Sequence, residues 1–416
     1  MERLAVMTMA AAFVAQPAVT PTGPGNGSPV DVLTLISLMA VAIWATTSRL
    51  RLRAPYILGA GLMILAGVVA GVNGPLPGTS AIAVIQDVVL ITWCTAAVAV
   101  ASTPHRLRLL AAAWANSAMV CALILVIGSL LHITAITGVV PREGNRVLFT
   151  FGDPNYAATY WVLSIFIVYA VRVPQRRWLR WAGYAVLLWA LAMTESNGGA
   201  VELMSGCGLL ILAAVHRKRG LVASATLLFA AATCLTVTLA LVSVSSLQTW
   251  ARQSGNALLM NSLGRSNDSS SQRSQLIAES FQLYTTDGIL GSGPGTTKDL
   301  LTARSYAYAK EAHNDYLAAL TERGPLGLIG ILVLASSALW RTTRVLAPQA
   351  AIDLPRPTGL VAAALAAALA ASYYEILHFR FIWALLALIA VAAYQADDRS
   401  QVGLSGSTSG DEKVRP

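Results

Sequence analysis

Long apolar runs separated by short polar links dominate the chain. About 20 consecutive apolar residues are enough to cross a bilayer as a helix. The pattern predicts spans near residues 30–48, 56–72, 81–101, 109–132, 154–172, 178–194, 199–215, 220–244, 314–340, 358–375 and 378–395. A further stretch, 4–19, fits either a short first span or a signal-like segment. We therefore expect an all-α polytopic membrane protein with about 12 transmembrane helices, or 11 if 4–19 does not span.

The basic residues of the links indicate an orientation. Successive links between spans lie on alternate sides of the membrane, and one side holds most of the basic residues. These are Arg49, Arg51, Arg53, Arg106, Arg108, Arg172, Arg176, Arg177, Arg180, Arg217, Lys218, Arg219, Arg341, Arg344 and Arg356. The short links on the opposite side hold only Arg142, Arg146 and Arg380. Because basic residues are enriched in cytoplasmic links, this larger set is predicted to lie in the cytoplasm.

This orientation divides the chain into four parts. Residues 1–244 form the N-terminal transmembrane helices, and 245–312 form a long extracytoplasmic loop with helix-like stretches such as 273–284. Residues 313–395 form the C-terminal transmembrane helices. The polar, Gly/Ser-rich segment 396–416 is predicted to be a disordered cytoplasmic tail.

Composition supports a membrane protein and argues against other classes. Hydrophobic residues make up 56% of the chain and charged residues 12%, against about 25% charged in a typical soluble domain. The net charge of +9 comes mostly from the short links, so topology explains it and no nucleic-acid partner is expected. All four cysteines lie inside apolar runs, which predicts buried thiols and no disulfide framework.

His313 is the first candidate for chemistry. It lies where the outer loop meets the apolar run that leads to Trp340. Imidazole titrates near neutral pH and can accept a proton from a hydroxyl group. Taken alone, however, this histidine is explained more simply by local hydrogen bonding at the membrane boundary.

The outer segments also contain several arginines, which are Arg142, Arg146, Arg252, Arg265, Arg273 and Arg304. A guanidinium group can bind phosphate oxygens through two parallel hydrogen bonds. The acids of the same loop offer a simpler explanation as salt-bridge partners. The residues Asp153-Pro154-Asn155 are typical of the start of a helix, which explains Asp153 and Pro154 structurally. It does not explain Arg146.

Other charged or chemical signals are few. The acids Asp31, Asp87, Glu202 and Glu375 lie close to span ends and are interpreted mostly as interfacial. The chain has no Walker A sequence and no Cys/His spacing typical of zinc. We expect no metal and no cofactor.

Three segments resemble the O-antigen ligase and polymerase superfamily of bacterial membrane glycosyltransferases. The first, 146–157, begins with Arg146 and contains Pro154-Asn155. The second, 273–295, is an arginine-led helix followed by a Gly-x-Gly turn. The third and most specific, 313–328, begins with His313-Asn314 and continues with a Glu-x-Gly-x-x-Gly-Leu pattern.

The resemblance implies an inverting, metal-independent transfer of a glycan from a polyprenyl-diphosphate donor. It implies a bacterial inner membrane location with the site facing the periplasm or exterior, in contact with membrane lipid. His313 would be the catalytic base, supported by Asn314, Tyr316 and Asn155. The donor diphosphate would be bound by Arg146, Arg265, Arg273 and Arg142. Asn197 departs from the pattern, because family members often carry an arginine there.

The acceptor is left open by the sequence. A lipid A core acceptor would make the protein a ligase in lipopolysaccharide synthesis, a growing glycan a polysaccharide polymerase, and a protein hydroxyl an O-oligosaccharyltransferase. A transporter of a small anion is the alternative from another class. It would place its key residues near mid-membrane, whereas these candidates lie in outer loops.

Overall fold

The structure is a computed structural model of the chain. It describes all residues except 21–26, 51, 140–145, 257–258, 261–263, 265–267, 305–312, 348–351 and 408–416. Every regular element in the described part is helical, which confirms the expected all-α class.

The first eight helices are α1 (Glu2–Val14), α2 (Pro29–Ser48), α3 (Ile57–Asn73), α4 (Pro77–Val100), α5 (Pro104–Leu130), α6 (Thr134–Thr137), α7 (Pro154–Val171) and α8 (Arg177–Met193). They are followed by α9 (Asn197–Leu241), α10 (Val244–Gln253), α12 (Asp268–Asp287), α13 (Thr297–Ala303), α14 (Asp315–Leu346), α15 (Thr358–Ala370) and α16 (Arg380–Ser407).

Seven of the described helices are long and apolar enough to cross a membrane, and α3 and α15 are shorter apolar helices. The total of about 12 spans remains a prediction. At the C-terminus, α16 continues to Ser407, so the first part of the predicted disordered tail is helical.

Local sequence explains where several helices begin. Pro29, Pro77, Pro104 and Pro154 occupy the first turns of α2, α4, α5 and α7, where the missing N–H of proline costs no hydrogen bond. Before α7, the Asp153 carboxylate accepts a hydrogen bond from the Asn155 backbone N–H at 2.7 Å. This is the helix start that the sequence predicted.

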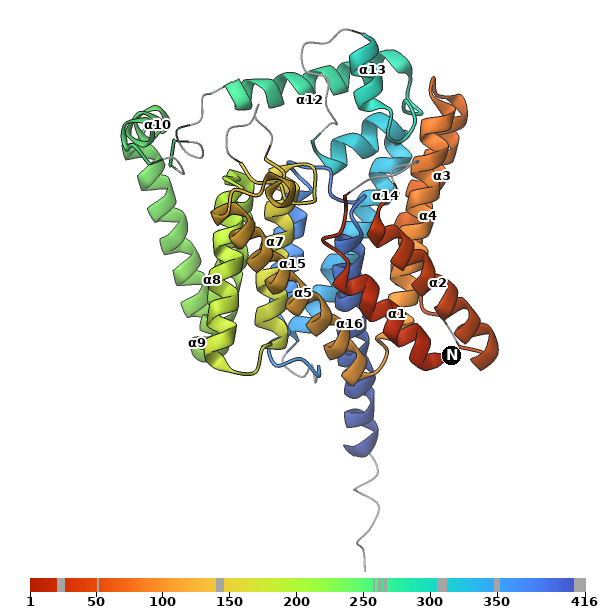
Figure 1. The fold of residues 1–416 in the computed structure, drawn as a ribbon. Helices are drawn as coiled ribbons and strands as arrows, with labels where there is room; N and C mark the ends of the chain where they lie inside the picture. Colours follow the sequence, from red (N-terminus) through yellow and green to blue (C-terminus); the bar gives the residue numbers. More distant parts are fainter. Residues whose placement is uncertain are drawn as a thin grey trace, which may run out of the picture.

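The helix α9 contains two predicted spans in one element. Gly220 has φ of 79° and ψ of −171°, a backbone conformation that only glycine adopts easily. The chain turns back at this point, and Figure 1 shows the second half, in green, returning to α10. Ser224, just after the turn, is the only buried side chain among those described in 221–238.

The helix α7 lies at the centre of the bundle and is buried along almost its whole length. It packs against α5, α8, α9 and α15. The Tyr160 ring of α7 stacks on the Trp114 ring of α5, and the Trp114 indole N–H donates a hydrogen bond to the Ser164 hydroxyl oxygen at 2.9 Å. The stacked rings and the Trp114 hydrogen bond give the contact between α5 and α7 both buried area and a defined orientation.

The stretch 4–19, ambiguous in the sequence, contributes α1 to the same core. Ala5, Met9, Ala12 and Phe13 fall on one face of α1 and are fully buried against α2, α4 and α5. The N-terminal end of α1 is held to α5 by an ion pair between Glu2 and Arg106.

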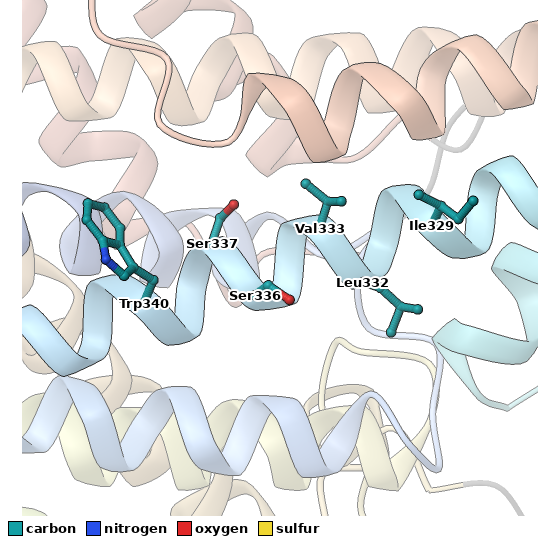
Figure 2. Close-up of a pocket in the computed structure, with 6 residues that line it drawn as sticks. All are labelled: Ile329, Leu332, Val333, Ser336, Ser337 and Trp340. Atoms are coloured by element: carbon teal, nitrogen blue, oxygen red, sulfur yellow. The ribbon is translucent and has the colours of Figure 1, made fainter.

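A second group of helices packs beside this centre. The backbones of α3 and α14 come so close that a Cβ atom at Gly59 would lie 2.6 Å from the Leu334 nitrogen. A shallow hollow of about 420 Å³ lies on the exposed side of α14. Figure 2 draws its lining residues, which are Ile329, Leu332, Val333, Ser336, Ser337 and Trp340. These residues lie along the helix away from the segment that begins at His313.

At one end of the bundle, α12 lies across the helices rather than along them (Figure 1). Its inner face contributes Leu276 and Leu283 to a small apolar cluster with Leu300 and Leu301 of α13. The same end of the bundle carries the starts of α7, α9 and α14.

Candidate functional site

The candidate site lies where α7, α9 and α14 begin, next to the segment 371–379 that joins α15 to α16. The first link is centred on Arg146, whose side chain is 5% exposed. Its Nε donates to the Thr194 carbonyl oxygen at 2.9 Å, and an Nη donates to the Asn155 side-chain oxygen at 3.0 Å. Ser196 donates to the same Asn155 oxygen at 2.8 Å. The guanidinium group therefore fixes the start of α7 against the turn before α9.

The start of α14 is docked onto the segment 371–379. The Asn314 side chain accepts hydrogen bonds from the N–H groups of Tyr316 and Leu317 at 2.9 and 3.0 Å, and donates to the Ser372 carbonyl at 2.8 Å. The Asp315 carboxylate accepts from the Ile376 N–H at 3.0 Å. Asn314 is thus the N-cap of the helix and an anchor for its neighbour.

His313 precedes this cap and is half-buried, with a left-handed φ of 50°. Left-handed backbone is uncommon for residues other than glycine, and it aims the side chain differently from a helical residue. The imidazole ring lies edge-on to Tyr374, with ring centroids 6.5 Å apart. A polar ring held in this way can accept or pass on a proton once a substrate hydroxyl reaches it.

Tyr374 connects His313 to the other two helix starts. A Cβ atom at Gly198 would lie 2.4 Å from the Tyr374 hydroxyl, so the first turn of α9 fits this ring only because residue 198 is glycine. The Tyr156 ring of α7 lies 6.2 Å from the Tyr374 ring. The first and third resembling segments therefore meet around one buried tyrosine.

Next to Tyr374, Tyr373 lies in the same segment 371–379. Burial, followed by the nearby Glu202 carboxyl group, raises the pKa of Tyr373 above its usual value. The hydroxyl therefore stays protonated at neutral pH and remains a hydrogen-bond donor.

The glycine-rich turn binds the Glu322 carboxylate. Its oxygens accept from the Gly295 N–H at 2.8 Å and from the Thr297 N–H and hydroxyl at 3.2 and 2.8 Å. Gly291 has a φ of 87°, and a Cβ there would lie 2.6 Å from the Glu322 carbonyl carbon. The Gly-x-Gly turn and the Glu-x-Gly pattern are thus two halves of one structural contact that fixes the end of the outer loop.

The other predicted site residues are placed less completely. Arg142 and Arg265 lie outside the described residues. Arg273 lies in α12, and its side chain is not described. Tyr316 lines an apolar cavity of about 330 Å³ between α9, α14, α15 and α16. Within the described residues, no group of three or more His, Cys, Asp or Glu side chains could hold a metal ion.

Several contacts were not expected from the sequence. Ser196 and Tyr374 carry no motif, and their role depends on contacts between distant segments. Glu202, interpreted with the interfacial acids, is instead fully buried and accepts from the Thr159 hydroxyl at 3.0 Å. Asp31 and Asp87 have basic partners, Arg380 and Arg323, each with an N···O distance of 2.5 Å.

Comparison with known proteins agrees with the resemblance read from the sequence. No curated protein was found to match the chain. The model of the family described as O-antigen ligase matches residues 182–332. The match runs from α8 to the middle of α14 and includes the outer loop, the glycine-rich turn and His313. Residues 182–332 are therefore similar to the O-antigen ligase family.

Proposed function

We propose that the protein transfers a glycan from a polyprenyl-diphosphate donor to an acceptor hydroxyl at the outer face of a bacterial plasma membrane. The observation that supports this most is the position of His313 in the family domain. It sits at the start of α14, one buried tyrosine away from the helix start that Arg146 fixes.

In the proposed reaction, His313 accepts the proton of the acceptor hydroxyl. The hydroxyl oxygen attacks the anomeric carbon of the donor sugar as the bond to the diphosphate oxygen breaks. The configuration at that carbon is inverted, and the polyprenyl diphosphate leaves with the bonding electron pair. Fixed positive charges stabilise the leaving diphosphate.

Arg146 supplies one such charge, since two of its donors are fixed on protein oxygens close to the starts of α7 and α9. Helix N-termini add partial positive charge to their surroundings. Arg142, Arg265 and Arg273 are proposed as further diphosphate contacts from the outer segments. Asn314 and Asn155 act as positioning residues, and Tyr316 is proposed to support the acceptor side.

The test is His313→Ala in cells that depend on this protein for a surface glycan. We expect long glycans to disappear and the lipid-linked precursor to accumulate, with the protein still present in the membrane. The matched control is His105→Ala, an exposed histidine in the first turn of α5. Normal long glycans in His313→Ala cells would rule out the general-base role, whereas a solute-uptake defect with intact glycans would favour a transporter.

A further inference from the structure

A polar cavity lies beside the candidate site. It has a volume of about 410 Å³, within the range of roughly 300–1,000 Å³ typical of small-molecule sites. Its walls come from α3, α4, the start of α13, the first turns of α14 and the segment 375–378. Thr79, Gln86, Lys298 and His378 are among its polar lining residues. Such a mixture of amide, hydroxyl and charged groups provides both donors and acceptors.

The cavity adjoins the segment that carries His313. Asp315, two residues after it, lines the cavity and fixes the backbone N–H groups of Ile376 and Leu377 at 3.0 and 3.3 Å. His378 also lines the cavity, and its ring lies 5.8 Å from Tyr156, which in turn contacts Tyr374. The cavity is therefore connected through these rings to Tyr374, the residue that His313 contacts.

The charge of the cavity lining differs from that around Arg146. The cavity lining contains the carboxyl groups of Asp87, Asp299, Asp315, Glu322 and Glu375, against the cations Lys298 and Arg323. Arg323 is already paired with Asp87 at 2.5 Å. An excess of carboxyl groups in a confined space repels phosphate and suits hydroxyl or amino groups, whereas the Arg146 guanidinium group attracts anions.

The cavity wall is built by the contact between Glu322 and the glycine-rich turn. Because Gly295 and Thr297 bind this carboxylate, the turn is fixed above α14 and brings Lys298 and Asp299 to the rim. The Glu-x-Gly and Gly-x-Gly motifs thus shape a cavity that contains neither His313 nor Arg146.

We propose that this cavity binds the acceptor, and that the acceptor enters it as a saccharide unit without phosphate groups. This inference rests on the proposed transferase function and adds the acceptor class to it. The excess of carboxyl groups in the cavity then keeps the diphosphate out of the acceptor position, whereas Arg146 attracts it.

The test measures binding by protection of a cysteine. Ala83 lines the cavity, so Ala83→Cys is introduced into full-length protein whose four native cysteines are replaced by serine. The rate of modification by a small maleimide is measured in lipid nanodiscs. The probe is the host's surface glycan, cut into short oligosaccharides and freed of phosphate. We expect it to slow modification at least fivefold, and a phosphorylated preparation of the same oligosaccharides to slow it much less.

Gln86→Leu removes an amide from the cavity wall and should abolish this protection, while Gln248→Leu in α10 should retain it. No protection by the phosphate-free probe, or stronger protection by the phosphorylated one, would overturn the proposal. His313→Ala separates the two claims, because it should keep full protection while losing transfer. If the His313→Ala protein keeps both glycan transfer and protection of the introduced cysteine by the probe, the catalytic role of His313 is wrong and the assignment of the cavity stands.

Discussion

At the scale of single residues, Arg146 combines two tasks that a sequence cannot tell apart. Its side chain holds the turn before α9 against the start of α7, and it keeps a positive charge at a fixed point between them. The expected arginine near residue 197 is absent, and α9 begins there with Ser196 as its N-cap. Part of the positive field at this position therefore comes from the helix start itself.

Arg146→Lys tests whether the fixed guanidinium shape matters. Lysine keeps the charge but cannot span Thr194 and Asn155 with the same planar group. A buried acceptor left without a partner costs about 1–3 kcal/mol, so we expect a lower unfolding midpoint and weaker transfer. Thermal unfolding in detergent and glycan length in cells measure the two effects.

The control for Arg146→Lys is Arg217→Lys, an exposed arginine in α9 near the turn at Gly220. Here the structure predicts no change in either measurement. An Arg146→Lys protein as stable and active as the parent would show that a point charge at this position is sufficient.

At the scale of elements, apolar patterning predicted the positions of several helices. The predicted spans 30–48 and 154–172 correspond to α2 (Pro29–Ser48) and α7 (Pro154–Val171), both long and apolar enough to cross a membrane, and the helix-like stretch 273–284 lies inside α12. Apolar patterning works here because a membrane span must satisfy its backbone hydrogen bonds within its own helix, so that a long apolar run predicts a helix. The contacts of Tyr374 and Glu322 could not be predicted in this way, because pairing between distant segments leaves no periodic signal.

The turn within α9 gives a sharp prediction at this scale. Gly220→Ala should destabilise the hairpin by about 1–3 kcal/mol, because a Cβ atom at its φ of 79° strains the backbone even though the surrounding space is open. Gly208→Ala is the matched control, since Gly208 also has open space around it but lies within the regular part of α9. That change should be neutral or stabilising by up to ~1 kcal/mol.

Thermal unfolding of both purified variants in the same detergent measures this difference. Equal midpoints for Gly220→Ala and Gly208→Ala would contradict the sharp turn and favour one continuous α9 helix.

At the scale of the whole molecule, the bundle has two unlike ends. One end carries α10, α12, α13 and the candidate site, and the other carries the extension of α16 beyond the bundle (Figure 1). The large excess of basic residues in the links at the second end predicts that this end faces the cytoplasm.

Cysteine labelling in intact cells tests this orientation. In a background without native cysteines, Ser245→Cys in α10 should react with a membrane-impermeant maleimide added outside. Gln175→Cys, in the link between α7 and α8, should react only after the membrane is opened. The opposite pattern of labelling would place the candidate site in the cytoplasm.

The turn at Gly220 also bears on how this protein could diversify. From the second half of α9 to Gly288, the described side chains add little to the central core, and the chain rejoins the bundle where Glu322 binds the glycine-rich turn. Recombination between related genes at these two points would exchange one predicted span and the outer loop, and would leave the core around α7 in place. Sequence changes between these two points can therefore accumulate with little effect on the packing around α7.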